Sequence, residues 1–253
     1  MGIKISILGC GWLGFPLAES LIYKGFQVKG SVRSQERVQK LEKKGINPFL
    51  INLGSAQNDY LAFCDSEILI IAVPEKEVAG FANLIEQIEK SNIKKVIYIS
   101  STSVYENSNE EVTEATPVKD CPLSRIEELF RNKTRFETTV IRFAGLFGYD
   151  RKPVNFIPKT KPMQNPIGFV NLVHRDDCIG IIEEIIRQNC WGETFNACAD
   201  SHPARREFYT EVAKKEGQSA PKFDENSANN WKIVSSNKLK TKLNYSFQYV
   251  DIM

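Results

Sequence analysis

Apolar residues in the first half of the chain form short runs that alternate with segments of helical spacing. The run Glu67–Val73 is continuously apolar after its first residue, as is typical of a strand covered on both faces of a sheet. Val78–Lys90 instead repeats its apolar positions with the period of an amphipathic helix. The same patterns predict a first strand that begins at Ile3 and further strands at Gln27–Val32, Phe49–Leu53, Lys95–Ser100 and Thr139–Phe143. Helices are predicted at Phe15–Lys24 and Gln35–Lys44. Such alternation predicts an α/β protein with a parallel, doubly wound sheet.

A glycine-rich turn joins the first strand to the first helix within Ile3–Gly14, which reads IKISILGCGWLG. In a G-x-G-x-x-G turn, Gly9 permits the tight bend, Gly11 lets a pyrophosphate approach the backbone, and Gly14 lets the helix pack closely on the strand. The free N–H groups at the helix N-terminus also favour phosphate. This motif, in this position, predicts a dinucleotide site in a Rossmann fold with ligands at the carboxyl ends of the strands.

The length of 253 residues is large for a single core and predicts two domains. We expect a dinucleotide-binding Rossmann domain over residues 1–145 and a smaller C-terminal substrate lobe over residues 146–253, interleaved with the last sheet strands. The second lobe should contain a proline-rich loop at Lys152–Pro166, helices at Arg175–Gln188 and Arg205–Glu216, and a strand at Thr194–Ala197. Asp176 or Asp177 is expected to cap the first of these helices, and Lys232–Leu243 to form a solvated basic face.

Composition narrows the classes of function. The net charge of +2 gives no electrostatic case for binding nucleic acid or a membrane surface, and a small-molecule substrate is expected instead. No apolar segment is long enough to span a membrane, and the first residues form a strand rather than a signal peptide. Six cysteines without a C-x-x-C pattern are typical of buried thiols in a cytoplasmic protein. Two widely separated histidines offer no metal-ligand spacing, so no metal is predicted, and the oligomeric state is left open.

The turn after the second strand bears on the choice between NAD and NADP. NAD-selective sites usually place an acidic residue there to bind the ribose 2′-hydroxyl. Residues 29–34 of this chain contain no carboxylate and place Arg33 at the turn, followed by Ser34, which is also a candidate helix cap. Because a guanidinium can bind a 2′-phosphate that a carboxylate would repel, NADP is predicted as the cofactor, with NAD as the alternative.

Four blocks together resemble extended or atypical short-chain dehydrogenases/reductases related to the NAD(P)-dependent epimerases and dehydratases. They are the glycine turn, Val96–Tyr105 (VIYISSTSVY), Ile141–Gly148 (IRFAGLFG) and Val170–Asp177 (VNLVHRDD). Their order and spacing match the family across nearly the whole chain. No single block is as specific as the set.

The resemblance implies roles for individual residues. Ser101, four residues before Tyr105, takes the place of the catalytic hydroxyl that hydrogen-bonds a substrate oxygen. Tyr105 is a further acid–base candidate, although packing is the simpler interpretation. Asn171 and His174 are expected on the substrate side, although a hydrogen-bonded hinge residue is the simpler interpretation of His174. The other cofactor-binding candidates are Gly9, Gly11, Trp12, Leu13, Gly14, Ala72, Val73, Pro74, Ser100, Arg142, Ala144 and Leu146.

The chain departs from the family at its catalytic pair. Family members use a tyrosine and a lysine four residues apart, one helical turn, so that the lysine lowers the tyrosine pKa. The corresponding stretch here reads DCPLSRIEE from Asp120. Alignment of Arg125 with the lysine puts Cys121 at the tyrosine position, and a shifted alignment brings Asp120 and Ser124 into register. Neither alignment recovers the pair, so the usual dehydrogenase mechanism is not expected.

Two functions remain open from the sequence. One is an NADP-dependent oxidoreductase or epimerase acting on a small polar substrate, either sugar-derived or nucleotide-linked. The other is a non-catalytic NADP-binding sensor or regulatory protein. A basic cleft formed by Arg151, Lys152 and Arg206 would favour a phosphorylated or nucleotide-linked substrate, and Arg206 is therefore a candidate substrate-binding residue.

Overall fold

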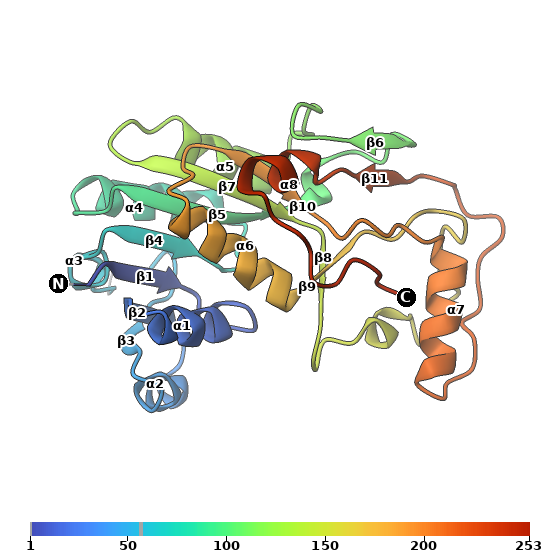
Figure 1. Ribbon diagram of the computed structural model, residues 1–253, viewed down its shortest axis with the longest axis horizontal. Coiled ribbons are helices and arrows are strands. Elements are labelled where there is room, and N and C mark those ends of the chain that lie inside the picture. The colour runs from blue at the N-terminus through green and yellow to red at the C-terminus, as the bar shows by residue number, and fades with distance from the viewer. Residues whose placement is uncertain (1, 56–57) are drawn as a thin grey trace. The chain divides into compact units, whose positions relative to one another are not determined.

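Figure 1 shows the strands of the main sheet side by side. The computed structural model describes residues 2–55 and 58–253. The seven strands of the sheet have the order β3-β2-β1-β4-β5-β7-β10. Strand β1 pairs in parallel with β2 and β4, β2 with β3, and β4 with β5, so the strand order reverses direction between β1 and β4. This confirms the predicted doubly wound α/β fold. The strands are β1 (Lys4–Leu8), β2 (Gln27–Val32), β3 (Asn47–Leu50), β4 (Ile68–Ile71), β5 (Lys95–Ser101), β7 (Glu137–Phe143) and β10 (Thr194–Ala197).

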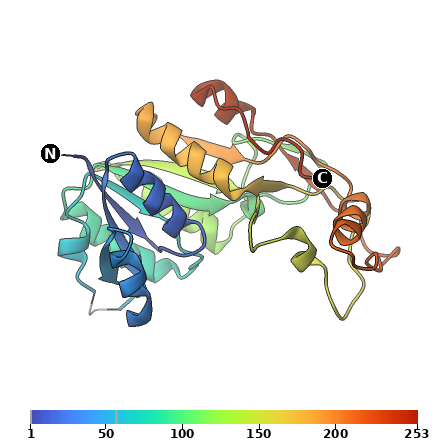
Figure 2. The same ribbon diagram turned by 60° about the horizontal axis from the view of Figure 1, so that its bottom comes forward.

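Helices cover both faces of the sheet (Figures 1 and 2). Helices α1 and α6 lie on one face, where Ser20 of α1 donates a hydrogen bond to Glu183 of α6. Helices α4 and α5 lie on the other. Within the described ranges, no helix combines the length and the apolar character needed to cross a membrane. The helices that alternate with the strands of this sheet are α1 (Gly14–Tyr23), α2 (Gln35–Glu42), α3 (Tyr60–Phe63), α4 (Val78–Glu89), α5 (Pro122–Arg131) and α6 (Arg175–Arg187).

A continuous apolar core explains why the central strand was recognisable in the sequence. All four residues of β4 are buried, because the strand lies between neighbours and beneath helices on each side. On the α4 and α5 face, Tyr98 of β5 stacks on Phe130 of α5 with ring centroids 5.3 Å apart, and Phe81 of α4 meets both rings edge-on. These contacts fix α4 and α5 against the carboxyl-terminal half of the sheet.

The third strand begins earlier than its apolar pattern indicates. It was predicted at Phe49–Leu53, but β3 covers Asn47–Leu50 and includes Pro48. Because β3 is the edge strand, a proline that cannot donate a ladder hydrogen bond is tolerated there. Beyond the strand, Asn52 and Leu53 belong to a loop, and this loop lines a cavity described below.

The chain divides into two compact units that interleave along the sequence. Unit 1 consists of Met1–Ser100, Asp120–Ile141 and Ile182–Thr194, and unit 2 consists of Ser101–Lys119, Arg142–Ile181 and Phe195–Met253. An interleaved second lobe was predicted, but unit 1 ends its first segment at Ser100 rather than at residue 145, and unit 2 already includes Ser101–Lys119. The chain leaves unit 1 directly after β5, and it returns there to form α5 and the end of α6. Sequence patterning alone does not reveal such an excursion, because its segments are short.

Unit 2 is built from short elements around two small parallel strand pairs, β6 with β11 and β8 with β9. Its apolar core gathers around Phe208 and Tyr209 of α7. The proline-rich segment is mostly irregular, as predicted, with one turn of 3-10 helix at Pro153–Phe156. The segment Lys232–Leu243, predicted as a solvated basic face, contains a strand and a helix and buries Val234, Leu239 and Leu243. The remaining elements are β6 (Glu110–Val112), β8 (Gly145–Phe147), β9 (Leu172–His174), β11 (Lys232–Val234), α7 (Arg205–Lys215), α8 (Asn237–Leu243) and a 3-10 turn at Thr102–Val104.

A buried carboxylate anchors the C-terminal segment of unit 2. Asp177, which is fully buried, accepts hydrogen bonds from the Tyr245 hydroxyl at 3.0 Å and from the backbone N–H groups of Gln248 at 2.7 Å and Tyr249 at 3.1 Å. Its partners lie about seventy residues away in the sequence. The expected role as a helix cap did not anticipate this long-range contact.

Candidate functional site

The glycine turn between β1 and α1 is tight at two of its glycines and open at the third. Gly9 has φ +98°, a conformation that favours glycine, and its N–H donates to Ser31 Oγ at 2.9 Å. A Cβ on Gly14 would lie 2.2 Å from the Gly9 carbonyl oxygen, whereas a Cβ on Gly11 would meet no described atom within 4 Å. The turn therefore has the backbone geometry of a diphosphate site, with its open face at Gly11.

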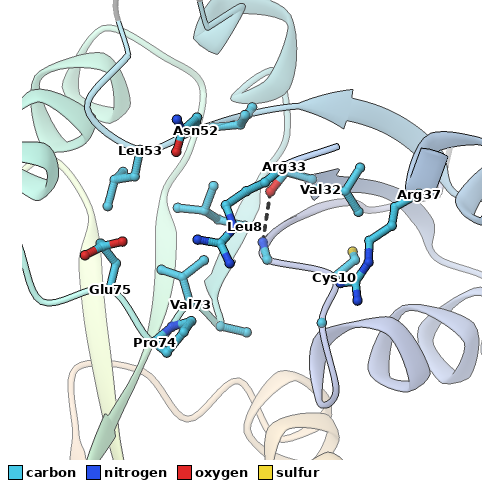
Figure 3. Close-up of a pocket in the computed structure, with 15 residues that line it drawn as sticks. Leu8, Cys10, Val32, Arg33, Arg37, Asn52, Leu53, Val73, Pro74 and Glu75 are labelled. Carbon is cyan, nitrogen blue, oxygen red and sulfur yellow. Dashed lines mark hydrogen bonds between the residues drawn. The ribbon is translucent and has the colours of Figure 1, made fainter. Parts of the chain in front are cut away.

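A cavity of about 110 Å³ lies beside this turn, at the carboxyl ends of β1 and β2 (Figure 3). We call it the glycine-turn cavity. Its walls come from the turn itself, from the segments after β3 and β4, and from two arginines, one directly after β2 and one in α2. The predicted cofactor-binding residues that line it are Gly9, Gly11, Arg33, Ala72, Val73 and Pro74.

Two guanidinium groups line the glycine-turn cavity, although the sequence pointed to only one of them. Arg33 follows β2, as predicted, and Arg37 comes four residues later in the first turn of α2. Figure 3 shows both side chains reaching toward the glycine turn, with Arg37 beside Cys10 and Glu75 on the side of Leu53. Within residues 2–55 and 58–253, neither arginine has an ion-pair partner within 4.0 Å. The spacing of the two arginines at a strand-to-helix turn is the signal that could have identified Arg37.

The other predicted cofactor residues of unit 1 lie outside the lining of this cavity. Leu13 and Gly14 begin α1, next to Trp12, and Ser34 precedes α2. Ser100 is buried, and its hydroxyl donates a hydrogen bond to the Glu127 carboxylate at 2.5 Å. Ser100 is thus held by a buried acid on α5, a partner that the sequence did not suggest.

Cys10 is an inert filler within the glycine turn. Burial raises the pKa of its thiol to about 12, so the thiolate is scarce at neutral pH. Its sulfur occupies the space beside Gly30, where an added Cβ would come within 2.6 Å of it. This agrees with the interpretation of Cys10 as a small packing residue.

The start of α5 contains the four residues that the two sequence alignments matched to the family's tyrosine and lysine. Cys121 precedes the helix, and its backbone N–H donates a hydrogen bond to the Ser124 hydroxyl oxygen at 3.0 Å, as in a capping box. Arg125 is exposed and forms two hydrogen bonds of 2.6 Å with Asp120. All four residues considered in the two alignments therefore have local roles at the start of the helix.

A second, more polar cavity of about 360 Å³ lies within unit 2, and we call it the unit 2 cavity. Two predicted site residues, Ser101 and Asn171, line it. Ser101 Oγ accepts the Ser103 N–H at 3.1 Å, which orients the hydroxyl at the start of a 3-10 turn. Asn171 is held by its side-chain amide, which donates to the Lys232 carbonyl at 2.9 Å. Two basic residues that the sequence analysis did not select, Arg205 and Lys232, also line this cavity.

Tyr105 does not face either cavity, which argues against the catalytic role considered for it. Its side chain is fully buried, and its hydroxyl donates to Asn196 Oδ1 at 2.8 Å and accepts from Arg142 Nη1 at 2.6 Å. Burial raises the pKa of Tyr105 although Arg142 lies beside it. The packing interpretation fits this geometry. Of the candidates expected at the nicotinamide, Arg142 and Ala144 are likewise buried in unit 2, and Leu146 lies in β8.

Tyr105→Phe should lower the free energy of unfolding by about 1–3 kcal/mol, because buried polar atoms of Arg142 and Asn196 lose a partner. Urea denaturation measures this change. Tyr23→Phe is the matched control, since Tyr23 is 93 % exposed and its replacement should leave stability unchanged. Equal stability of the two variants would show that the Tyr105 hydroxyl contributes nothing.

His174 is enclosed by aromatic rings rather than by a cavity. Its imidazole stacks on Tyr249 with ring centroids 3.6 Å apart and also contacts Phe147 and Tyr149. Burial lowers its pKa below the ordinary value, so the neutral form is favoured. The geometry fits the structural interpretation better than a substrate-binding one. Over the described part of the chain, no three His, Cys, Asp or Glu side chains are grouped as metal ligands.

The basic cleft expected from Arg151, Lys152 and Arg206 is largely neutralised. Lys152 pairs with Glu216 at 2.9 Å, and Arg206 pairs with Glu225 at 2.6 Å. None of the three lines the unit 2 cavity, where the neighbouring Arg205 is found instead. Adjacent residues of a helix point in different directions, so the one-residue difference between Arg205 and Arg206 decides which side chain reaches the cavity.

Comparison with known proteins agrees with this geometry. Residues 9–175 match the family model described as NAD(P)H-binding. The chain is 31 % identical to Protein YeeZ of Escherichia coli K12 over 266 aligned positions, which cover 98 % of this chain and 97 % of that protein.

Solved structures show the same fold at lower identity. The UDP-glucuronic acid 4-epimerase of Bacillus cereus in complex with NAD superposes with a TM-score of 0.79 at 19 % identity, covering 97 % of this chain and 92 % of that one. A short-chain dehydrogenase/reductase superfamily protein of Agrobacterium tumefaciens with bound NAD gives a TM-score of 0.78 at 15 % identity, with coverages of 97 % and 92 %. The chain therefore belongs to the NAD(P)H-binding family and has the Rossmann fold of the epimerase/dehydratase-like short-chain dehydrogenases/reductases.

Proposed function

We propose that this protein is an NADP-dependent oxidoreductase of the epimerase/dehydratase type that acts on a small polar substrate bound in the unit 2 cavity. The observation that carries the proposal is the pair of guanidinium groups of Arg33 and Arg37 beside the glycine turn, neither of which has an ion-pair partner among the described residues. A site built for a cofactor with an additional phosphate requires such unneutralised charge.

The residues around the glycine turn fit NADP. Open space at Gly11 suits the approach of a diphosphate, and Arg33 and Arg37 are placed to bind a 2′-phosphate. Solved relatives carry NAD, and it is the arginine pair that favours NADP in this chain. When bound, the nicotinamide supplies a hydride acceptor or donor.

The substrate side of the proposal rests on Ser101. Its hydroxyl lines a cavity rich in hydroxyl and amide groups and is oriented by the Ser103 N–H. A hydroxyl held in this way can donate a hydrogen bond to a substrate oxygen on which negative charge develops. The residues Cys121 and Arg125 do not reproduce a phenol and an ammonium, so Ser101 is the chain's principal candidate for that contact.

A non-catalytic NADP-binding sensor is the second candidate. It is supported by the local roles of Cys121 and Arg125 at the start of α5, the residues that one alignment matched to the family's tyrosine and lysine. Both functions require the glycine-turn cavity. They differ in whether the unit 2 cavity supports turnover.

Calorimetric titration with NADPH and NADH followed by a turnover screen separates the two functions. We expect NADPH to bind more tightly than NADH. With NADP+ or NADPH supplied, we expect at least one compound from a panel of sugars, sugar acids and nucleotide sugars to be converted, followed both by nicotinamide absorbance and by product analysis, because an epimerase regenerates its cofactor. Ser101→Ala should lower that rate by about tenfold or more without changing NADPH affinity. Ser219→Ala is the control, because Ser219 is exposed and lines neither cavity. Tight NADPH binding without turnover across the panel would favour the sensor, and failure to bind either nucleotide would contradict both functions.

A further inference from the structure

The unit 2 cavity has an uncompensated positive charge. Arg205, at the start of α7, and Lys232, in β11, are the charged residues that line it within the described part of the chain. Lys232 Nζ donates to the Tyr105 carbonyl at 3.0 Å and to Asn107 Oδ1 at 2.9 Å, both neutral acceptors. In the described part of the chain neither basic residue has a carboxylate within 4.0 Å.

Polar atoms in this cavity are buried without a partner. Arg205 Nε and Asn165 Oδ1 are both shielded from solvent, and neither has a hydrogen-bond partner in the described structure. Burial also lowers the pKa of Lys232, because its ammonium has lost water; nearby Lys119 lowers the pKa further, and Glu106 only partly opposes the shift. Unpaired buried polar groups destabilise a fold unless a ligand or water completes them, so these two atoms leave unused hydrogen-bonding capacity in residues that line the cavity.

The rest of the lining indicates what that molecule contains. Hydroxyl and amide side chains predominate, namely those of Ser101, Thr102, Ser103, Asn107, Asn171 and Asn230. Phe169 and Trp231 pack edge-to-face at 4.8 Å between ring centroids and provide an apolar wall. A polyhydroxylated compound can use both surfaces, because its hydroxyl groups bind the polar side chains and its C–H face packs on the rings.

We propose that the unit 2 cavity binds a small polyhydroxylated anion, such as a sugar acid or sugar phosphate, whose oxyanion pairs with Arg205 and Lys232. The inference rests on the proposed function, since it names the substrate class for the same cavity. A volume of about 360 Å³ is near the lower end of ligand pockets, which span roughly 300–1,000 Å³. It therefore favours a compound without an attached nucleotide.

Calorimetry with matched charged and neutral probes tests this site. The protein is first saturated with NADPH, so that Arg33 and Arg37 are occupied. It is then titrated with L-tartrate against L-threitol and with glycerol 3-phosphate against glycerol. We expect at least one anion to bind about tenfold or more tightly than its neutral counterpart, and the two pairs distinguish a carboxylate from a phosphate ligand.

Variants assign the anion to its residues. Arg205→Gln and Lys232→Gln should each weaken binding by about tenfold or more, whereas Arg205→Lys should retain most of it. Arg206→Gln is the matched control, because Arg206 is the adjacent residue and pairs with Glu225 outside the cavity. Thermal unfolding of each variant verifies that it is folded. If Arg205→Gln is not folded, Arg205→Lys together with Lys232→Gln still tests whether the anion binds these two residues.

Several outcomes would overturn the inference. Equal binding of charged and neutral probes would do so, as would anion binding that is unaffected by Arg205→Gln and Lys232→Gln. Binding of UDP-glucose without binding of the small anions would assign the cavity to a nucleotide-linked substrate instead. Failure of NADPH to bind would contradict the proposed function but not the anion site. The anion titration would then be repeated with the double variant Arg33→Gln/Arg37→Gln, in which neither arginine can bind the probe. Anion binding without turnover would likewise contradict only the oxidoreductase.

Discussion

Arg33→Asp should reverse the cofactor preference of the protein. In the wild type, the guanidinium groups of Arg33 and Arg37 beside the glycine turn are expected to bind the 2′-phosphate of NADPH. An aspartate at residue 33 removes one of these charges, repels the phosphate and can accept the 2′-hydroxyl of NADH. NADPH affinity should therefore fall by about ten- to a hundredfold, and NADH should become the tighter ligand. Calorimetric titration of wild type and variant with both nucleotides measures the change.

Two further variants, at Arg37 and at Lys43, show whether the effect is specific to the arginines that line the cavity. Arg37→Gln should weaken NADPH without improving NADH, because it removes a phosphate contact and adds no acceptor. Lys43→Gln removes a positive charge from the end of the same helix, away from the cavity, and should change neither affinity. Tighter binding of NADH than NADPH by the wild-type chain would show that the arginines do not select a 2′-phosphate.

Gly14→Ala should destabilise the whole of unit 1. The added Cβ would lie 2.2 Å from the Gly9 carbonyl oxygen and 3.3 Å from Ile7 Cγ2, so the first turn of α1 would have to move away from β1. Overpacking of this kind costs about 1–3 kcal/mol of unfolding free energy. The melting temperature should fall by about 2–4 °C for each kcal/mol in a chain of this size. Thermal unfolding followed by circular dichroism measures the loss.

Gly11→Ala is the matched variant and should behave in the opposite way. Its Cβ would meet no described atom within 4 Å, so stability should be unchanged. The methyl group would instead occupy the space into which a diphosphate approaches, and the affinity for NADPH should decrease by about tenfold or more. If Gly11→Ala bound NADPH normally, the open face of the turn would not be the diphosphate site.

The elements predicted correctly are those whose pattern depends on local sequence. The apolar run of β4 and the glycine turn after β1 were recognisable because burial on both faces and a tight bend each limit the residues allowed. The third strand was displaced because its pattern at the sheet edge is weak and includes Pro48. Short elements of unit 2, such as β6 and β11, were missed because three residues show no periodicity.

The candidate site was predicted in part for the same reason. Arg33 follows a recognisable strand, so its position at the cofactor cavity could be anticipated. Arg205 and Lys232 come from elements that are distant in sequence, and no local pattern relates them. Tyr105 belongs to a family-like block, but its hydroxyl is occupied by Asn196, ninety-one residues away.

By itself, the sequence determined the α/β class, the dinucleotide turn and the arginine that follows the second strand, because backbone geometry and periodic burial act over a few neighbouring residues. Only the tertiary structure decided which charges are neutralised. It pairs Arg206 with Glu225 and leaves Arg205 facing a cavity, a choice that depends on side-chain direction and on partners brought together by folding. Electrostatic complementarity is a property of three-dimensional proximity, so the charge available to a ligand could not be read from the order of residues.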